Sequence, residues 1–243
     1  MKRHALLVGY TASDTDSEET LDGVLLDLEN YKNYLKSLKG GAWYDNEITI
    51  LNNTTKLNLD LQISILKAKD IDIVFSVFTG HGGFDKNHQC RRFLINKDET
   101  YLEKNILGIS KKQIFIYDSC SNIIKESIQN KRVINSLLET ASDYRRKLAR
   151  DKYEEYCNSC EPQRVRLYAS KVGYSAEDKN GGIYTNALIE TLNNSNGYMS
   201  IVKAHDEASK LVFARTESGD GDGQITERQV TRTSKFLPGA INV

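Results

Sequence analysis

Two residues, His81 and Cys120, each come just after an apolar run and could together perform nucleophilic chemistry. His81 lies in the turn Gly80-His81-Gly82, and Cys120 ends the run Asp118-Ser119-Cys120. The thiolate of a cysteine is the attacking species, and a nearby imidazole produces it by taking the thiol proton. Taken singly, the histidine is also typical of a glycine-rich turn, and the cysteine of a buried strand end. Their ordered combination predicts a cysteine protease.

The glycines beside His81 add a second catalytic feature. Because they have no side chain, they let a substrate approach the backbone closely. The backbone N–H groups of Gly82 and Cys120 are candidates to stabilise the oxyanion that forms when a carbonyl is attacked. We therefore predict a catalytic dyad of His81 and Cys120, with an oxyanion hole at Gly82 and Cys120.

Alternating strands and helices must position these residues. Short apolar runs predict buried strands, and apolar residues three and four positions apart predict helices. The segment 54–69 fits either a strand or a helix that Thr54 and Thr55 cap. We favour the helix because parallel strands need a crossover. The expected strands are 5–10, 47–51, 71–78, 113–117 and 165–170; the expected helices are 21–38, 54–69, most of 122–156, 184–193 and 200–213; the tail 218–243 is expected to be less regular.

This order of elements predicts an α/β fold with a mostly parallel central sheet and helices on both faces. A length of 243 residues suits one such domain. Sites in these folds form at the carboxyl ends of the strands. His81 and Cys120 follow two such strands, so both side chains are expected at one edge of the sheet.

Several motifs now resemble one family, the caspase-like cysteine peptidases, within its branch of metacaspases and prokaryotic caspase homologues. The turn Gly80-His81-Gly82 and the run Asp118-Ser119-Cys120 occur in that family's order, after a similar opening strand. Gly23 and Asp27 resemble its first-helix motif, and the segments 176–177 and 182–188 resemble its small-subunit part. The resemblance covers residues 5 to about 195 and implies a caspase-like single domain. It departs at Ser121-Asn122, where the family often has His or Gly.

The resemblance also implies where the substrate binds. In the metacaspase branch, the acid two residues before the cysteine helps to form the S1 pocket, which gives this role to Asp118. Asp27 is the expected second carboxylate, and Thr79 falls where the family has a small hydroxyl residue. Two carboxylates favour a cation, so we expect cleavage of a protein or peptide after Arg or Lys. A solvated helix residue at Asp27 and a turn residue at Asp118 are the plainer alternatives.

The resemblance further implies a division into a large-subunit-like part at 1–121, a charged helical insert at 122–163 and a small-subunit-like part at 164–243. The insert is rich in Lys and Arg, notably at 145–152. A protease with a basic preference could cut itself there, so we expect a zymogen that self-cleavage or an upstream activator converts. The alternative is a solvated amphipathic helix.

No metal or cofactor is required by the predicted chemistry. Cys157 and Cys160 form a single C-x-x-C pair, which is half of a zinc site. The segment 218–225 resembles the middle of a calcium loop, but Ser218 replaces the first acid and Gln229 stands at the bidentate position. An Asp/Gly turn explains this segment equally. Some metacaspases depend on calcium, which leaves calcium dependence open through residues we do not assign.

The bulk composition restricts the partners. Lys and Arg number 33, as do Asp and Glu, so the formal charge is zero and gives no reason to expect nucleic acid or a membrane. The first apolar run is too short for a signal peptide, and four cysteines are no disulfide framework, so we expect a cytoplasmic protein. A glycine-rich nucleotide loop does not follow the first strand. A catalytically silent caspase-like binding module is the remaining alternative.

Overall fold

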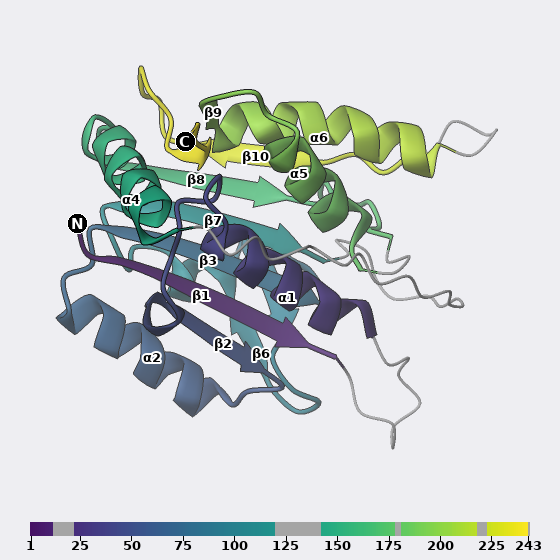
Figure 1. Ribbon diagram of the computed structural model, residues 1–243. Coiled ribbons are helices and arrows are strands. Elements are labelled where there is room, and N and C mark those ends of the chain that lie inside the picture. The colour runs from purple at the N-terminus through teal and green to yellow at the C-terminus, as the bar shows by residue number, and fades with distance from the viewer. Residues whose placement is uncertain (12–21, 120–141, 178–180, 218–222, 243) are drawn as a thin grey trace.

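The computed structural model describes residues 1–11, 22–119, 142–177, 181–217 and 223–242. Its centre is a six-stranded sheet in the order β10-β8-β7-β3-β1-β2. Every neighbouring pair is parallel except the edge pair of β10 with β8. The strands are β1 (Arg3–Tyr10), β2 (Ile48–Asn52), β3 (Ile73–Gly80), β7 (Lys112–Asp118), β8 (Gln163–Tyr168) and β10 (Glu227–Val230). The carboxyl ends of β1, β3, β7 and β8 meet at one edge of the sheet (Figure 1).

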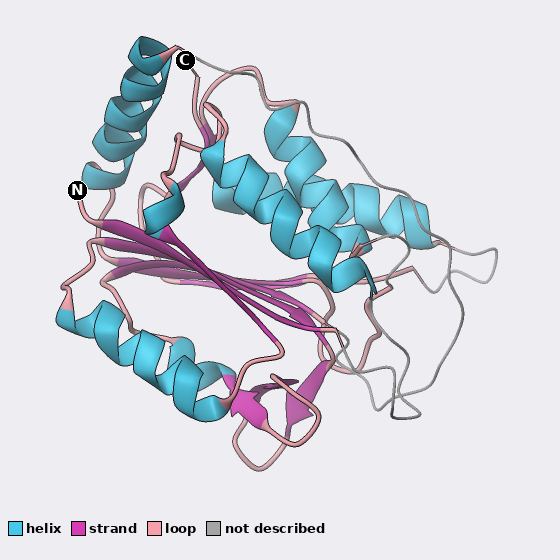
Figure 2. Ribbon diagram, turned by 60° about the horizontal axis from the view of Figure 1, so that its bottom comes forward, coloured by secondary structure: helices cyan, strands magenta, loops and turns pink. Residues whose placement is uncertain are grey.

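Helices cover both faces of this sheet, as the alternation of elements predicts (Figures 1 and 2). The β1 strand shows why, because Ala5 and Leu7 point into one core while Leu6 and Val8 point into the other. A strand buried on both faces reads as a continuous apolar run. One face carries α1 (Asp22–Lys36), α4 (Asp143–Asn158), α5 (Ile183–Asn193) and α6 (Ile201–Thr216), and the other carries α2 (Lys56–Ala68) and α3 (Glu103–Ile106).

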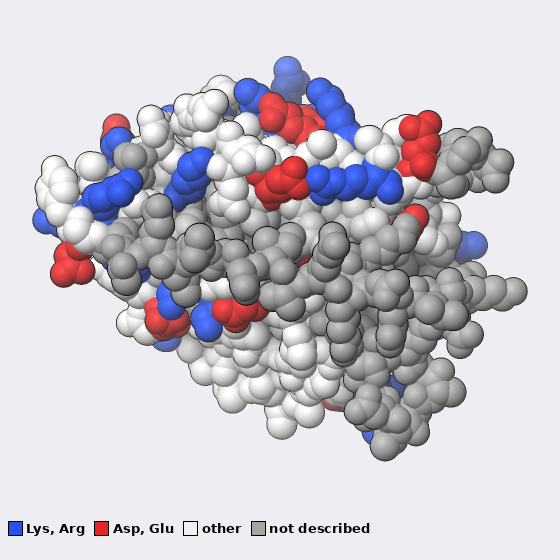
Figure 3. Space-filling model, turned by 45° about the vertical axis from the view of Figure 1, so that its right-hand side comes forward, with Lys and Arg blue, Asp and Glu red and all other residues white. Residues whose placement is uncertain are grey.

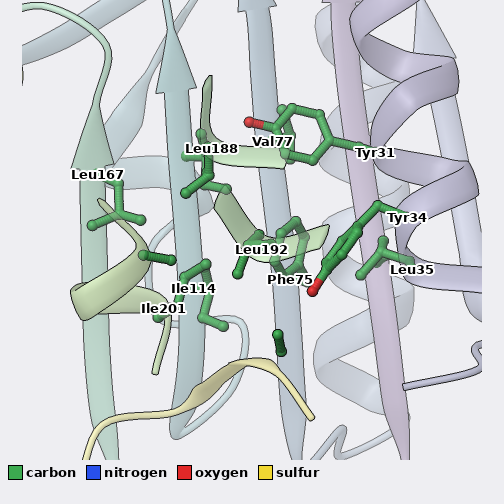
Figure 4. Packing of buried hydrophobic residues seen from close by; sticks show 14 of the residues in the cluster. Tyr31, Tyr34, Leu35, Phe75, Val77, Ile114, Leu167, Leu188, Leu192 and Ile201 are labelled. Carbon is green, nitrogen blue, oxygen red and sulfur yellow. The ribbon is translucent and has the colours of Figure 1, made fainter. Parts of the chain in front are cut away.

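The larger core lies between the sheet and the helices α1, α5 and α6. Tyr31 and Tyr34 of α1 point toward Phe75 of β3 and toward the leucines of α5 (Figure 4). The hydroxyl of Tyr34 donates to the carbonyl of Gly239 at 2.6 Å, so this buried phenol keeps a hydrogen bond. The hydrogen bond ties α1 to β11 (Pro238–Ala240), near the end of the chain.

A small antiparallel sheet follows β3 and was not predicted from the sequence. It consists of β4 (Gly82–Asp85), β5 (Cys90–Leu94) and β6 (Thr100–Leu102). These strands are short and rich in glycine or charge, so they lack the apolar runs that reveal the central strands. Phe93 of β5 stacks on Phe78 of β3, with ring centroids 4.1 Å apart. The aromatic stack holds the small sheet against the end of β3.

The predicted strands and helices of the central layers are confirmed to within a few residues, including helix over strand at α2. The tail is largely irregular as expected, but it contains the short strands β10 and β11, and β11 pairs with the short strand β9 (Met199–Ser200). In the insert, α4 buries Ala149, Tyr153 and Cys157. The expected helical stretch at 122–141 lies outside the described residues.

The basic helix α4 is amphipathic, with one buried stripe and an exposed face that includes Arg145 and Lys147, and one of its arginines fastens it to the sheet. Arg150 forms a two-pronged ion pair with Glu47, at 2.7 and 2.8 Å, and lies 3.9 Å over the ring of Tyr44. Arg3 of β1 also bonds Glu47, and its guanidinium lies over Trp43. These contacts fasten α4 to β1 and to the short 3-10 helix η1 (Asp45–Glu47).

His205 lies on the buried face of α6 and should make the fold sensitive to acid. Burial first, and then Arg228, lower the pKa of His205 to about 4, and its Nδ1 bonds the hydroxyl of Tyr184 at 2.7 Å. The unfolded chain takes up this proton near pH ~6.5, so stability is full above that pH and falls as the pH drops toward ~4.

We expect this one histidine to reduce the free energy of unfolding by about 2 kcal/mol between about pH 7.5 and about pH 5. Urea unfolding of the wild type and of His205→Gln at both pH values measures it. The variant should lose that share of the pH dependence. An identical pH dependence in the two proteins would contradict the prediction.

None of the helices in the described part of the chain is both long enough and apolar enough to cross a membrane.

Candidate active site

His81 follows β3 directly, at the carboxyl edge of the sheet. Gly80 before it has a φ of +135°, and a Cβ there would lie 2.7 Å from the carbonyl oxygen of Tyr10, so the turn requires glycine. The carbonyl of His81 accepts a hydrogen bond from the N–H of Leu94 at 3.0 Å, and its ring packs edge-on against Tyr10. Among the residues that the structure describes, the buried Nε2 of His81 has no hydrogen-bond partner.

The strand that leads to Cys120 lies beside β3. Thr79 and Asp118 are paired across β3 and β7, so His81 and Cys120 each follow this pair by two residues in the sequence. Cys120 itself lies outside the described residues. Ser119, its neighbour in the chain, is buried, and the carbonyl of Ser119 accepts a hydrogen bond from Ser170 Oγ at 3.1 Å.

Asp27 lies on α1 and faces the end of β3. Its side chain is buried, with a residue exposure of 2%, so a solvated helix position is excluded. Thr79 Oγ1 donates to Asp27 Oδ2 at 2.7 Å, and the N–H of Gly182 donates to both carboxylate oxygens, at 3.0 and 3.2 Å. The structure thus brings Asp27 and Thr79 together, two residues that were selected from distant parts of the sequence.

Asp118 meets the same helix terminus from the sheet. The N–H and the hydroxyl of Thr185 both donate to Asp118 Oδ2, at 3.1 and 2.5 Å. A Cβ on Gly182 would lie 2.2 Å from that oxygen, so the backbone of Gly182 fits between the two acids only as glycine. Asp118 is therefore more than a strand-end turn residue.

The two acids thus flank the N-terminus of α5, which begins after Gly182. Free N–H groups and the helix dipole favour negative charge at this position. The pKa of the Tyr31 phenol is raised well above its usual range, mainly by burial. The nearby charge of Asp118 and, more weakly, that of Asp27 raise it further, so the hydroxyl stays neutral. Asp27 and Asp118 thus form a buried acidic cluster, called the anionic cluster below, at the N-terminus of α5.

Gly82 packs against the end of β7. A Cβ at Gly82 would lie 2.0 Å from the Tyr117 hydroxyl and 2.6 Å from Ser119 Oγ. The position therefore requires glycine because of close packing, and the backbone that follows His81 lies directly on the strand that precedes Cys120.

Asp27, Thr79 and Asp118, which the family resemblance implied, lie in one cluster at the sheet edge that also ends in His81. Gly182 and Thr185 had no predicted role, although both lie in the segment that carries the family resemblance. Tyr117 was missed altogether, since an aromatic residue in an apolar strand gives no signal beyond packing.

The metal hypotheses gain no support from the described part of the chain, where no group of three His, Cys, Asp or Glu side chains could hold an ion. Burial raises the pKa of the Cys157 thiol, which opposes the thiolate that zinc requires. The Sγ of Cys160 bonds the carbonyls of Tyr156 and Phe236. Gln229, which stands at the bidentate position of the calcium-like pattern, lies in β10 and pairs with Arg166 of β8. Residues 218–222 of that pattern lie outside the described residues.

A mostly parallel sheet covered on both faces, with polar residues gathered at its carboxyl edge, defines an α/β domain. The chain belongs to the caspase family, because the family model for the caspase domain of peptidases (Peptidase_C14) matches residues 2–237. The family is one of cysteine peptidases, so its substrates are proteins.

Solved structures agree on the fold. The crystal structure of caspase-1 from Spodoptera frugiperda matches with a TM-score of 0.62 and 15% sequence identity, over 95% of this chain and 86% of that chain. No curated protein matches the chain.

Proposed function

We propose that the protein is a cysteine endopeptidase in which Cys120 is the nucleophile and His81 the general base. The observation that carries the proposal is the register of β3 with β7, because both residues follow the paired Thr79 and Asp118 by the same number of residues. The buried Nε2 of His81 is a suitable acceptor for a thiol proton.

The proposed reaction has two halves. In the first, His81 takes the thiol proton, the Cys120 sulfur attacks the scissile carbonyl, and the N–H groups of Gly82 and Cys120 bind the oxyanion. Protonated His81 then gives its proton to the leaving amine, and a thioester remains. In the second half, His81 takes a proton from water, and the hydroxide attacks the thioester carbonyl. The C–S bond then breaks, His81 returns the proton to the Cys120 sulfur, and the carboxylic acid product leaves.

The proposed specificity is for Arg or Lys at the residue before the cut. Asp27 and Asp118 supply two buried carboxylates, and Thr79 bonds one of them. A buried anionic pocket favours a cation and disfavours an acidic residue. Arg is expected to be the better of the two, because its planar guanidinium can bond a carboxylate through two N–H groups.

The test uses the full chain and matched fluorogenic peptides that end in Arg, Lys or Asp, with and without calcium. We expect cleavage after Arg and Lys. A peptidyl chloromethyl ketone ending in Arg should label Cys120, which mass spectrometry of the digested protein locates. Cleavage after Asp would overturn the proposed pocket, and no labelling of Cys120 in an active protein would overturn the proposed nucleophile.

We also propose that the protein is made as a zymogen, with processing in the insert between the large-subunit-like part (1–121) and the small-subunit-like part (164–243). Within 122–163, the segment from Asp143 to Asn158 is a packed helix, which a protease does not accept as an extended substrate. This favours a cut at Lys125, Lys131 or Arg132.

Mass spectrometry of ageing wild-type protein and of Cys120→Ala measures the processing. We expect a cut after one of these three basic residues that depends on Cys120. A wild type that stays intact while cleaving peptides would exclude self-processing.

We propose that the peptidase requires no cofactor and works in the cytoplasm. Nucleic acids and membranes have no role in its proposed activity. On the described part of the face in Figure 3, positive and negative side chains lie interspersed, so that part offers no uniformly basic surface to nucleic acid or an anionic membrane. The calcium arm of the peptide assay decides whether the ion affects the rate.

A further inference from the structure

We infer that the hydroxyl of Tyr117 is a positioning group for the catalytic centre, which fixes the backbone after His81 against the strand end before Cys120. The inference rests on the proposed function and concerns the geometry that the dyad and the oxyanion hole require.

The hydroxyl of Tyr117 connects three segments. It donates to the carbonyl of Arg92 at 2.6 Å, and a Cβ on Gly82 would lie 2.0 Å from it. Gly82 begins β4, and β4 pairs with β5, which contains Arg92. The hydroxyl therefore lies where both strands of the small sheet meet the end of β7.

The ring that carries this hydroxyl is fixed in place. Tyr117 is fully buried, with 0% exposure. Its ring packs against Phe78 at 5.4 Å and Phe93 at 5.7 Å between centroids. Burial raises the pKa of the phenol above its usual range, so the hydroxyl stays neutral and can donate one hydrogen bond while accepting others.

The position of the hydroxyl matters for chemistry because of what it orients. Its bond to the Arg92 carbonyl holds β5 against the end of β7, and β5 pairs with β4, which begins at the proposed oxyanion donor Gly82. The close approach of Gly82, whose Cβ would lie 2.0 Å from this hydroxyl, leaves no room for the backbone to shift toward it.

A positioning role and a purely structural role predict different kinetics. An interaction that only stabilises the fold lowers the amount of folded enzyme. A group that sets transition-state geometry lowers kcat and leaves KM nearly unchanged, because substrate binding does not depend on it. The anionic cluster that should hold the substrate lies at Asp27 and Asp118. Asp118 follows Tyr117 in β7, but its side chain bonds Thr185 on one face of the sheet while the Tyr117 ring packs in the core of the opposite face.

The test is Tyr117→Phe, which keeps the ring and removes the hydroxyl. Its matched control is Tyr101→Phe, because Tyr101 is also buried, also packs on Phe93, and donates its hydroxyl to Asp60 on α2, away from the site. We expect Tyr117→Phe to lower kcat roughly 10- to 100-fold with KM within about twofold. Tyr101→Phe should keep the wild-type kcat at a similar loss of melting temperature.

Three outcomes would overturn the inference about Tyr117 without affecting the proposed function. They are an unchanged kcat in Tyr117→Phe, an equal loss of kcat in Tyr117→Phe and Tyr101→Phe, or a rise in KM of Tyr117→Phe without a loss of kcat. If Tyr117→Phe does not fold, Ser119→Ala removes the side-chain oxygen that packs against Gly82 beside the Tyr117 hydroxyl, and a wild-type kcat in that variant also overturns it. A wild type without any Cys120-dependent cleavage would instead overturn the proposed function, which this comparison distinguishes from failure of the inference.

Discussion

Replacing His81 by Gln is expected to lower kcat/KM for an Arg peptide by about 10³-fold or more, equivalent to about 4 kcal/mol of transition-state stabilisation. Glutamine keeps a polar group of similar size at the turn after β3 but cannot take the thiol proton. Cys120→Ala should abolish cleavage, since the sulfur that forms the thioester is gone. The described contacts of His81 are few, so the fold should tolerate the change.

The pH dependence of alkylation gives a second measurement for the same pair. With His81 present, iodoacetamide should react with Cys120 well below pH ~8.5, the range where an ordinary thiol ionises. In His81→Gln, the reaction should require the ordinary thiol range. His88→Gln is the control, because His88 lies in the turn between β4 and β5, where it pairs with Asp85, and has no proposed catalytic role. An active His81→Gln variant would exclude His81 as the base.

The second large effect is expected at the anionic cluster. Asp118→Asn should lower kcat/KM for an Arg peptide by about 10²-fold, because a buried charge pair is worth a few kcal/mol when one partner loses its charge. Asparagine retains an oxygen that accepts from the N–H and hydroxyl of Thr185, so α5 keeps its cap. Asp27→Asn should act in the same direction.

Charge, rather than shape, is isolated by comparing a peptide that ends in Arg with one that ends in citrulline, its neutral analogue. The wild type should strongly prefer Arg, and each Asn variant should lose most of that preference. Asp45→Asn provides the control, since Asp45 is an acid at the surface that pairs with Lys36. Variants that keep the full preference for Arg over citrulline would show that neither carboxylate contributes to recognition of the substrate charge.

The elements that bury one apolar run or stripe could be predicted from the sequence because burial leaves a periodic signal. This holds for β1, β3 and β7. It also holds for α2, where the need for a crossover between parallel strands favoured a helix over a strand. The small sheet after β3 gives no such signal, since its strands are short and polar. Its position depends on tertiary contacts such as the stack of Phe93 on Phe78.

The candidate site divides in the same way. Strand ends and motif order located His81, Asp118 and Thr79, because those features are local in the sequence. The role of Gly182 depends on α5 meeting both acids, and the role of Tyr117 depends on a hydroxyl that reaches across to β4 and β5. Contacts between segments so far apart leave no pattern in one sequence.

The pairing of β7 with β8 has a consequence for how a cut in the insert would be detected. These adjacent strands lie on opposite sides of the proposed cut, yet they are hydrogen-bonded in register, and Arg150 with Glu47 fastens α4 across the same division. A nicked molecule would therefore keep its hydrodynamic size and elute from a gel-filtration column with the intact chain. Only a denaturing gel would separate the two pieces, so native chromatography would record latent and processed protein as a single species.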